Sequence, residues 1–271
     1  MTTASQSRPS RPAARTDWRS SIKTKGDGTP NRVVLHGVEG VGKTSFGAQA
    51  PAPIFIMARG ETGLEKLIDN RRVDDTPHFP ETQSWSDLLS QLEFLKTSDH
   101  DYKTVVIDTL NGCERLCHEH VCQQQYNGVW GKNGFTSYQQ GYEVALSDWR
   151  SFLTSLDEIN RSRKMSVLCL CHTKVAPFRN PEGADYDRYE PDMHRKTWGL
   201  THKWADIVGF LNFETFVDDS GGRSKAAGGQ SRMLYFEHHA AYDAKNRHGL
   251  PAEISGGKSA AEAWANFVKA L

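Results

Sequence analysis

The stretch HGVEGVGKTS, residues 36–45, constrains the fold of this chain more than any other part of its sequence. It contains the pattern Gly37-x-x-x-x-Gly42-Lys43-Thr44. Glycines let a backbone curl around an anion and turn its N–H groups inward. The pattern follows RVVLH (32–36), whose β-branched residues predict a buried strand, and it precedes a predicted helix. This order predicts a P-loop that holds phosphate groups at a helix N-terminus.

The P-loop residues have distinct expected roles. Lys43 would place its charge on the β- and γ-phosphates of a nucleotide, and Thr44 would offer its hydroxyl to Mg²⁺. The choice between ATP and GTP stays open. We expect ATP and Mg²⁺ as cofactors, with the nucleotide bound by Gly37, Val38, Glu39, Gly40, Val41, Gly42, Lys43, Thr44 and Ser45.

Strand and helix patterns alternate beyond the P-loop. Further strands are predicted over 53–58, 104–108, 165–171, 206–217 and 232–238, and helices over 43–49, 61–69, 84–97, 110–125 and 138–163. This alternation predicts right-handed crossovers and a mostly parallel sheet flanked by helices, an α/β fold. The glycine-rich connection 218–231 predicts a C-terminal β-hairpin, and residues 259–271 predict an amphipathic helix.

The composition of the chain limits its domain organisation, its partners and its compartment. Residues 1–30 are rich in Ser, Thr, Pro and Arg and predict a flexible basic tail, either solvated or a weak tether to nucleic acid, before one domain over 31–271. The formal net charge is zero, so any attraction to nucleic acid must be local. No apolar run approaches the roughly 18 residues of a membrane span, and no signal peptide is recognisable. Five cysteines, an odd number, favour a reducing compartment, and we expect a cytoplasmic protein.

Three polar residues follow predicted strands. Asp108 ends TVVID (104–108) and is the expected second Mg²⁺ ligand. Glu61 follows PIFIMA (53–58) and could orient the attacking water, or only complement a helix dipole. His172 follows the strand at 165–171 and could sense the nucleotide, or be a hydrogen-bonded structural histidine.

The segment CERLCHEHVC (113–122) gathers three cysteines and two histidines. A zinc site needs four converging ligands, and one straight helix cannot aim all of these side chains at one ion. Helix packing is therefore the favoured interpretation, with zinc as the alternative.

Six segments together resemble a known family: GVEGVGKTS, ETGL, VVIDTL, CHTK, WADIVGF and AKNR. Over about residues 31–255 the chain resembles the phage-encoded AAA-type ATPases of the RecA-core group, the single-strand annealing or recombinase-like proteins. The resemblance implies a RecA-like P-loop NTPase core without large flanking domains. It also implies that the strand ending at His172 lies between the P-loop strand and the Asp108 strand, and that Glu61 replaces the acid that activates water.

The resemblance further implies two DNA-contacting loops. The first corresponds to 125–138 and the second to 173–199, where aromatic and cationic residues alternate as single-stranded DNA requires. The alternatives are an insertion packed on a neighbouring subunit for the first loop and a flap over the nucleotide for the second. The expected DNA-binding residues are Trp130, Lys132, Phe135, Arg179, Tyr189, Arg195 and Lys196.

Lys245 and Arg247 follow what we predict to be the final core strand. RecA-like ATPases often place such cations against the γ-phosphate of a neighbouring subunit, so the resemblance implies a role in catalysis in trans. The alternative is a pair of surface charges on a loop.

These features predict an ATP-dependent recombination protein that binds single-stranded DNA and assembles into a ring or filament in the infected bacterial host. A single-strand-binding protein is a possible further partner, and no membrane is expected. The alternative functions are an ATPase that acts on protein partners in phage assembly or replication, without DNA, and a nucleotide-binding scaffold that does not hydrolyse.

Overall fold

A computed structural model describes residues 22–26, 28–218 and 225–271. Most of the basic tail predicted over 1–30, and the middle of the connection predicted over 218–231, lie outside the described residues.

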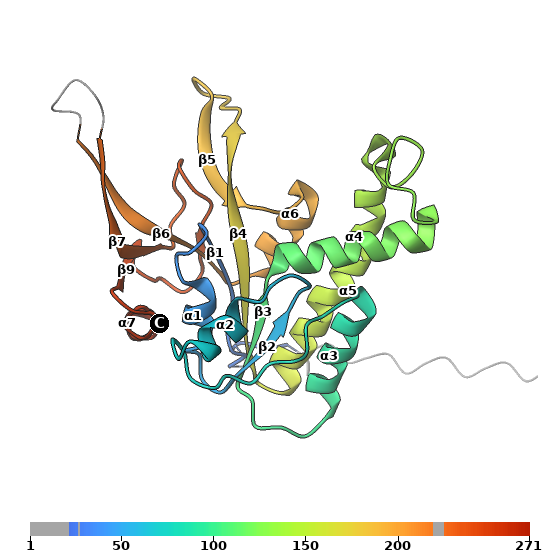
Figure 1. The fold of residues 1–271 in the computed structure, drawn as a ribbon, viewed down its shortest axis with the longest axis horizontal. Helices are drawn as coiled ribbons and strands as arrows, with labels where there is room; N and C mark the ends of the chain where they lie inside the picture. Colours follow the sequence, from blue (N-terminus) through green and yellow to red (C-terminus); the bar gives the residue numbers. More distant parts are fainter. Residues whose placement is uncertain (1–21, 27, 219–224) are drawn as a thin grey trace, which may run out of the picture.

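The molecule is built around one large sheet with helices on both faces (Figure 1). Along the sheet path the strands are ordered β2-β3-β4-β1-β6-β7-β9, with β5 paired to β4 and β8 paired to β6. The strands are β1 (Arg32–Gly37), β2 (Pro53–Met57), β3 (Thr104–Asp108), β4 (Ser166–Phe178), β5 (Tyr186–Pro191), β6 (Ile207–Asp218), β7 (Lys225–Tyr235), β8 (Lys245–Asn246) and β9 (Glu253–Gly257).

Strands β2, β3, β4, β1 and β6 pair in parallel, and β7 and β9 add antiparallel strands at one edge. This confirms the predicted α/β class and mostly parallel sheet. Strand β4 lies between β1 and β3, the order expected for a RecA-like core. The β6–β7 hairpin is present as expected, but it does not end the sheet, because β9 pairs with β7.

The helices divide between the two faces. They are α1 (Lys43–Gly47), α2 (Gly63–Asp69), α3 (Trp85–Thr97), α4 (Leu110–Tyr126), the short 3₁₀ turn η2 (Ser137–Gln139), α5 (Gln140–Ser162), α6 (Arg195–Trp204) and α7 (Ala260–Ala270). Helices α3, α4 and α5 cover one face and α1, α2 and α7 the other (Figure 1).

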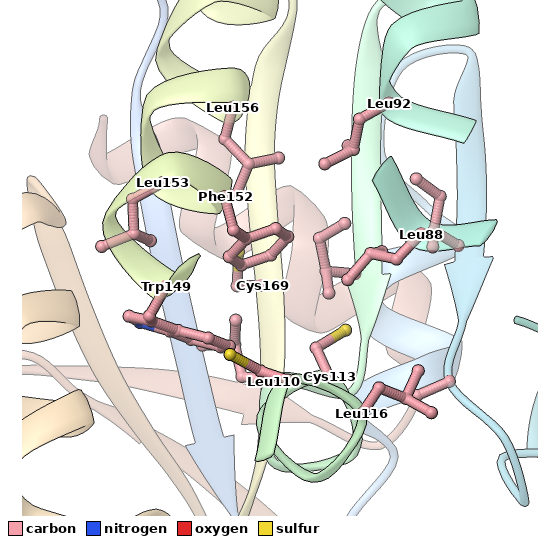
Figure 2. Packing of buried hydrophobic residues seen from close by; sticks show 14 of the residues in the cluster. Leu88, Leu92, Leu110, Cys113, Leu116, Trp149, Phe152, Leu153, Leu156 and Cys169 are labelled. Atoms are coloured by element: carbon pink, nitrogen blue, oxygen red, sulfur yellow. The ribbon is translucent and has the colours of Figure 1, made fainter. Parts of the chain in front are cut away.

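Successive residues of a strand point to opposite faces, so each central strand contributes to two hydrophobic cores. On β4, Val167 and Cys169 face the α3–α4–α5 side, whereas Leu168 and Leu170 face the other. Figure 2 shows the first core, where Leu88 and Leu92 of α3 and Phe152 of α5 point towards the sheet. Two-sided burial explains why these strands read as nearly continuous apolar runs in the sequence.

The segment 173–199 differs from its prediction as a loop. Strand β4 continues through it to Phe178 and forms an antiparallel hairpin with β5, after which α6 begins at Arg195. The hairpin extends well beyond the end of β3 (Figure 1). The prolines and acidic residues of this segment are typical of irregular structure, and for this reason no strand was predicted. Pro177 and Pro191 lie in a two-stranded ribbon, where proline is tolerated at an edge.

Candidate nucleotide and magnesium site

The P-loop lies at the carboxyl end of β1. Gly40 and Gly42 have φ angles of +70° and +100°, a left-handed region that glycine enters without steric cost. Gly37 packs against β6 so closely that a Cβ would lie 2.4 Å from the carbonyl oxygen of Leu211. These glycines are therefore required by the backbone path and by close strand packing.

Lys43 is folded back under the loop. Its Nζ donates to the carbonyl oxygens of Gly37 (2.8 Å) and Val38 (3.1 Å), and only 7% of the residue is exposed. Burial lowers the pKa of this ammonium, although the charges of Asp108 and Glu61 oppose that effect. The cation is thus held at the base of the loop that would bind phosphate.

Thr44 and Asp108 come together as the sequence predicts. Thr44 Oγ1 donates to Oδ2 of Asp108 at 2.8 Å, joining the start of α1 to the end of β3 across β4. Burial raises the pKa of Asp108 to about 6. A hydroxyl and a buried carboxylate form the hard oxygen donor set that Mg²⁺ prefers, so these two residues fit the ion.

Glu61 lies beside the same pair, in the connection between β2 and α2. Oε1 accepts a hydrogen bond from Thr109 Oγ1 at 2.9 Å and lies 3.2 Å from Nε2 of His172. Because a carboxylate only accepts, Nε2 of His172 carries the proton in this contact. The hydrogen bond from His172 is the largest cause that lowers the pKa of Glu61, which keeps this carboxylate ionised at neutral pH.

His172 lies within β4, directly opposite Gly37 of β1, rather than at the end of its strand. Its backbone N–H donates to Oδ1 of Asn111 at 3.1 Å, so α4 also holds it in place. Thr109 and Asn111 are site residues that the sequence did not identify. Their position just after the acid of β3 is the one signal that could have indicated them.

One cavity of about 500 Å³ unites these groups. P-loop residues line it together with Glu61, Asp108 and His172, which come from four neighbouring strands or the turns after them. Three cations that the sequence did not indicate also line it: Lys66, Arg72 and Arg232. The site therefore combines backbone donors, several cations, a Mg²⁺ donor pair and an ionised carboxylate.

The expected DNA-binding residues have different surroundings. Phe135 is fully buried against the rings of His118, Tyr126, Trp130 and Tyr142, so it is not available to stack on a base, contrary to expectation. Trp130 is 41% exposed, and Lys132 is exposed. The segment 125–138 is thus anchored by Phe135 and presents the other two residues.

The residues expected in the second loop lie on the hairpin and on α6. Arg179 is exposed just beyond β4, whereas Tyr189 is half-buried on β5 and stacks on Phe210 at 5.1 Å. Arg195 and Lys196 are exposed in the first turn of α6, where Lys196 pairs with Glu143.

Lys245 and Arg247 lie at the opposite end of β6 from the P-loop, because β8 pairs with Ile207 and Val208. They precede β9, so they do not follow the final strand as expected. Lys245 Nζ donates to the carbonyl oxygens of His202 and Ala205 at the end of α6, and burial lowers its pKa to about 8. Arg247 is exposed and lies 3.6 Å from Asp206.

The segment 113–122 forms part of α4. Cys113, Cys117 and Cys122 are buried in the core, and His118 packs against Phe135 and Tyr142. Within the described part of the chain, no group of three or more His, Cys, Asp or Glu side chains is placed to hold a metal ion. Likewise, none of its helices has the length and apolarity to cross a membrane.

Fold and site together define a P-loop NTPase with a RecA-like strand order. A family model described as an AAA domain matches residues 29–248, and the chain belongs to this family. None of the curated proteins matches the sequence. A solved structure described as the crystal structure of the RadB recombinase is similar, with 12% identity and a TM-score of 0.46, over 85% of this chain and 89% of that one.

Proposed function

We propose that this protein is a Mg²⁺-dependent ATPase in which Glu61 activates the attacking water. The observation that carries the proposal is the position of the Glu61 carboxylate. It is fixed by Thr109 and His172 and lines the same cavity as Lys43, Thr44 and Asp108. An ionised carboxylate beside a Mg²⁺ and phosphate site is what a general base for phosphoryl transfer to water requires.

Each residue then has one task. Lys43 and the loop N–H groups bind the β- and γ-phosphates, and Thr44 and Asp108 hold Mg²⁺. When bound there, the ion would neutralise charge that develops on the transferred phosphoryl group. Glu61 accepts a proton from water, and the Nε2–H of His172 keeps the carboxylate oriented. The Glu61–His172 contact also links the hydrolytic site to β4.

The first prediction is that Glu61→Gln binds Mg·ATP within a few-fold of wild type but hydrolyses it roughly 100-fold or more slowly, because an amide cannot accept the proton. Lys43→Ala is expected to lose nucleotide binding. Calorimetry and phosphate release measure the two effects. Glu65→Gln, an exposed change on α2, is the matched control. Normal turnover by Glu61→Gln would show that Glu61 is not the general base and only complements the dipole of α2.

We propose, as a second function, that the protein binds single-stranded DNA for recombination. It would do so as a homo-oligomer in the cytoplasm of the infected host, with a single-strand-binding protein as a possible partner. It is favoured by the continuity of β4, which runs from His172 directly into the exposed hairpin. The ring of Phe178 on this hairpin lies 5.1 Å from the ring of Tyr186, and the exposed cation Arg179 follows it directly. Aromatic faces beside cations suit bases and phosphates.

The second prediction concerns the end of the hairpin and the segment 125–138. Arg179→Ala and Lys132→Ala should each reduce the salt slope of single-stranded DNA binding by roughly 0.7. Trp130→Ala should weaken binding by about 1–3 kcal/mol if a base stacks there. Arg150→Ala on the exposed side of α5 is the control. Fluorescence anisotropy at several salt concentrations measures these effects. If the affinity for DNA changes neither with salt concentration nor in the three variants, a protein partner would be favoured instead of DNA.

A further inference from the structure

A second cavity of about 250 Å³ lies beside the P-loop. Its walls come from α1, the end of α2, strands β6 and β7, and the segment that joins β9 to α7. Gly42, Ser45, Leu67, Arg72 and Arg232 line both this cavity and the larger one. The two spaces are therefore neighbours that meet along the P-loop and the start of α1.

The two cavities are lined by different polar groups. This difference determines which end of a bound nucleotide would face each cavity. Glu61, Asp108 and His172 line the larger cavity and do not line the smaller one. Thr44 and Asp108 would hold Mg²⁺ against the terminal phosphate and Glu61 would activate water beside it, so this phosphate would lie on the side of the larger cavity. The remaining phosphates follow the loop away from Asp108, towards the smaller cavity.

Arg232 of β7 lies where the two cavities meet. Its Nε donates to the carbonyl oxygen of Val41 at 2.8 Å, and its Nη1 lies 3.4 Å from the carbonyl oxygen of Lys258. The side chain is thereby tied to the P-loop on one side and to the β9–α7 segment on the other. A guanidinium has five N–H donors, more than these two contacts use, in a fork that fits phosphate oxygens.

The smaller cavity suits a flat aromatic group. Phe46, Leu67 and Leu211 give it apolar walls, and the guanidinium groups of Arg72 and Arg232 lie at its border with the larger cavity. Apolar walls with a few placed polar groups are typical of small-molecule sites, and guanidinium groups stack on aromatic rings. The residues Lys258, Ser259 and Ala260 that close it lie beyond the region matched by the family model.

We propose that Arg232 binds the nucleotide in cis, on the side of the P-loop away from Asp108, and that the smaller cavity receives the base and ribose of a nucleoside triphosphate. This inference rests on the proposed function, because it requires the P-loop to hold the phosphates. It adds a nucleoside site and a second phosphate-binding cation to Lys43.

Calorimetry with two probes tests the proposal: Mg·ATP and inorganic tripolyphosphate with Mg²⁺. Wild type should bind ATP at least about tenfold more tightly than tripolyphosphate. Ala260→Phe, which fills the cavity at the start of α7, should lose this advantage but keep its affinity for tripolyphosphate. Arg232→Ala should weaken ATP binding by roughly 10-fold or more, as expected for a lost charge-assisted contact. Arg232→Lys should recover part of that loss, and Arg150→Ala should change nothing.

The outcomes separate the two proposals. Equal wild-type affinity for ATP and tripolyphosphate, or unchanged ATP affinity in both Ala260→Phe and Arg232→Ala, would overturn the nucleoside site while leaving the P-loop intact. A wild type that binds neither probe would overturn the proposed ATPase function. Thermal unfolding without ligand checks each variant. If Ala260→Phe does not fold, the smaller change Ala260→Leu replaces it, and unchanged ATP selectivity in that variant would count against the site.

Discussion

At the scale of single residues, the buried carboxylate of Asp108 lowers the stability of the folded protein when it is ionised. Asp108 is buried beside Glu61, and burial is the main reason that its pKa rises to about 6, above the ordinary value of 3.8. An acid whose pKa is higher in the folded state than in the unfolded state loses stability as it ionises. The penalty is therefore absent below about pH 4 and complete above about pH 6. A bound Mg²⁺ would offset this penalty, because it favours the ionised form.

The third prediction follows from this cost. Asp108→Asn should abolish Mg²⁺-dependent turnover, yet raise the free energy of unfolding of the nucleotide-free protein at pH 8 by up to about 3 kcal/mol. Chemical denaturation at pH 8 and pH 4 measures the change, which should shrink at the lower pH. An equal loss of stability at both values would show that the carboxylate stabilises the apo protein instead.

At the scale of elements, Glu114 joins two helices. It lies on α4, and its carboxylate accepts the backbone N–H of His194, the residue that precedes α6, at 3.0 and 3.1 Å. The first N–H groups of a helix have no partner inside it, so Glu114 supplies a cap from another element. Because α4 begins just after Asp108, this contact ties α6 and the neighbouring hairpin to the candidate nucleotide site.

The fourth prediction is that Glu114→Ala loosens the start of α6 by roughly 0.5–2 kcal/mol, the usual effect of a lost cap. Hydrogen exchange should become faster over 194–198 and remain unchanged in α3. Glu114→Gln is the matched control, since its amide oxygen can still accept the hydrogen bond. Unchanged exchange in the Ala variant would mean that packing alone holds α6.

Whether an element could be predicted from the sequence depended on its burial and its composition. Strands β1, β2, β3 and the first half of β4 were predictable because burial on both faces demands continuous apolar runs. Strand β9 was missed, since EISGG is short and carries two glycines, which strands generally disfavour. In the site, Lys43 and Thr44 followed from the spacing of the P-loop pattern, and Asp108 from its place at the end of a buried strand. Arg232 could not, because only the pairing of β7 between β6 and β9 brings it to the P-loop.

At the scale of the whole molecule, the proposed assembly requires groups that act between subunits. Arg247 is exposed and lies at the end of β6 opposite the P-loop, held by a long contact to Asp206. In the proposed head-to-tail ring or filament, a cation on this side of the molecule would face the site of a neighbouring subunit. Lys245 is less available, because three backbone carbonyls at the end of α6 surround its ammonium.

The fifth prediction is that Arg247→Ala binds Mg·ATP nearly normally but hydrolyses it poorly, because a missing finger removes charge stabilisation in trans. Mixing provides the decisive measurement. An Arg247→Ala subunit keeps an intact P-loop, and a Lys43→Ala subunit keeps an intact Arg247. Mixed assemblies should therefore contain some complete sites and recover part of the ATPase activity that each variant lacks alone. Lys203→Ala, a neighbouring cation on α6, is the control. If the variants assemble together and the mixture remains inactive, Arg247 does not act in trans.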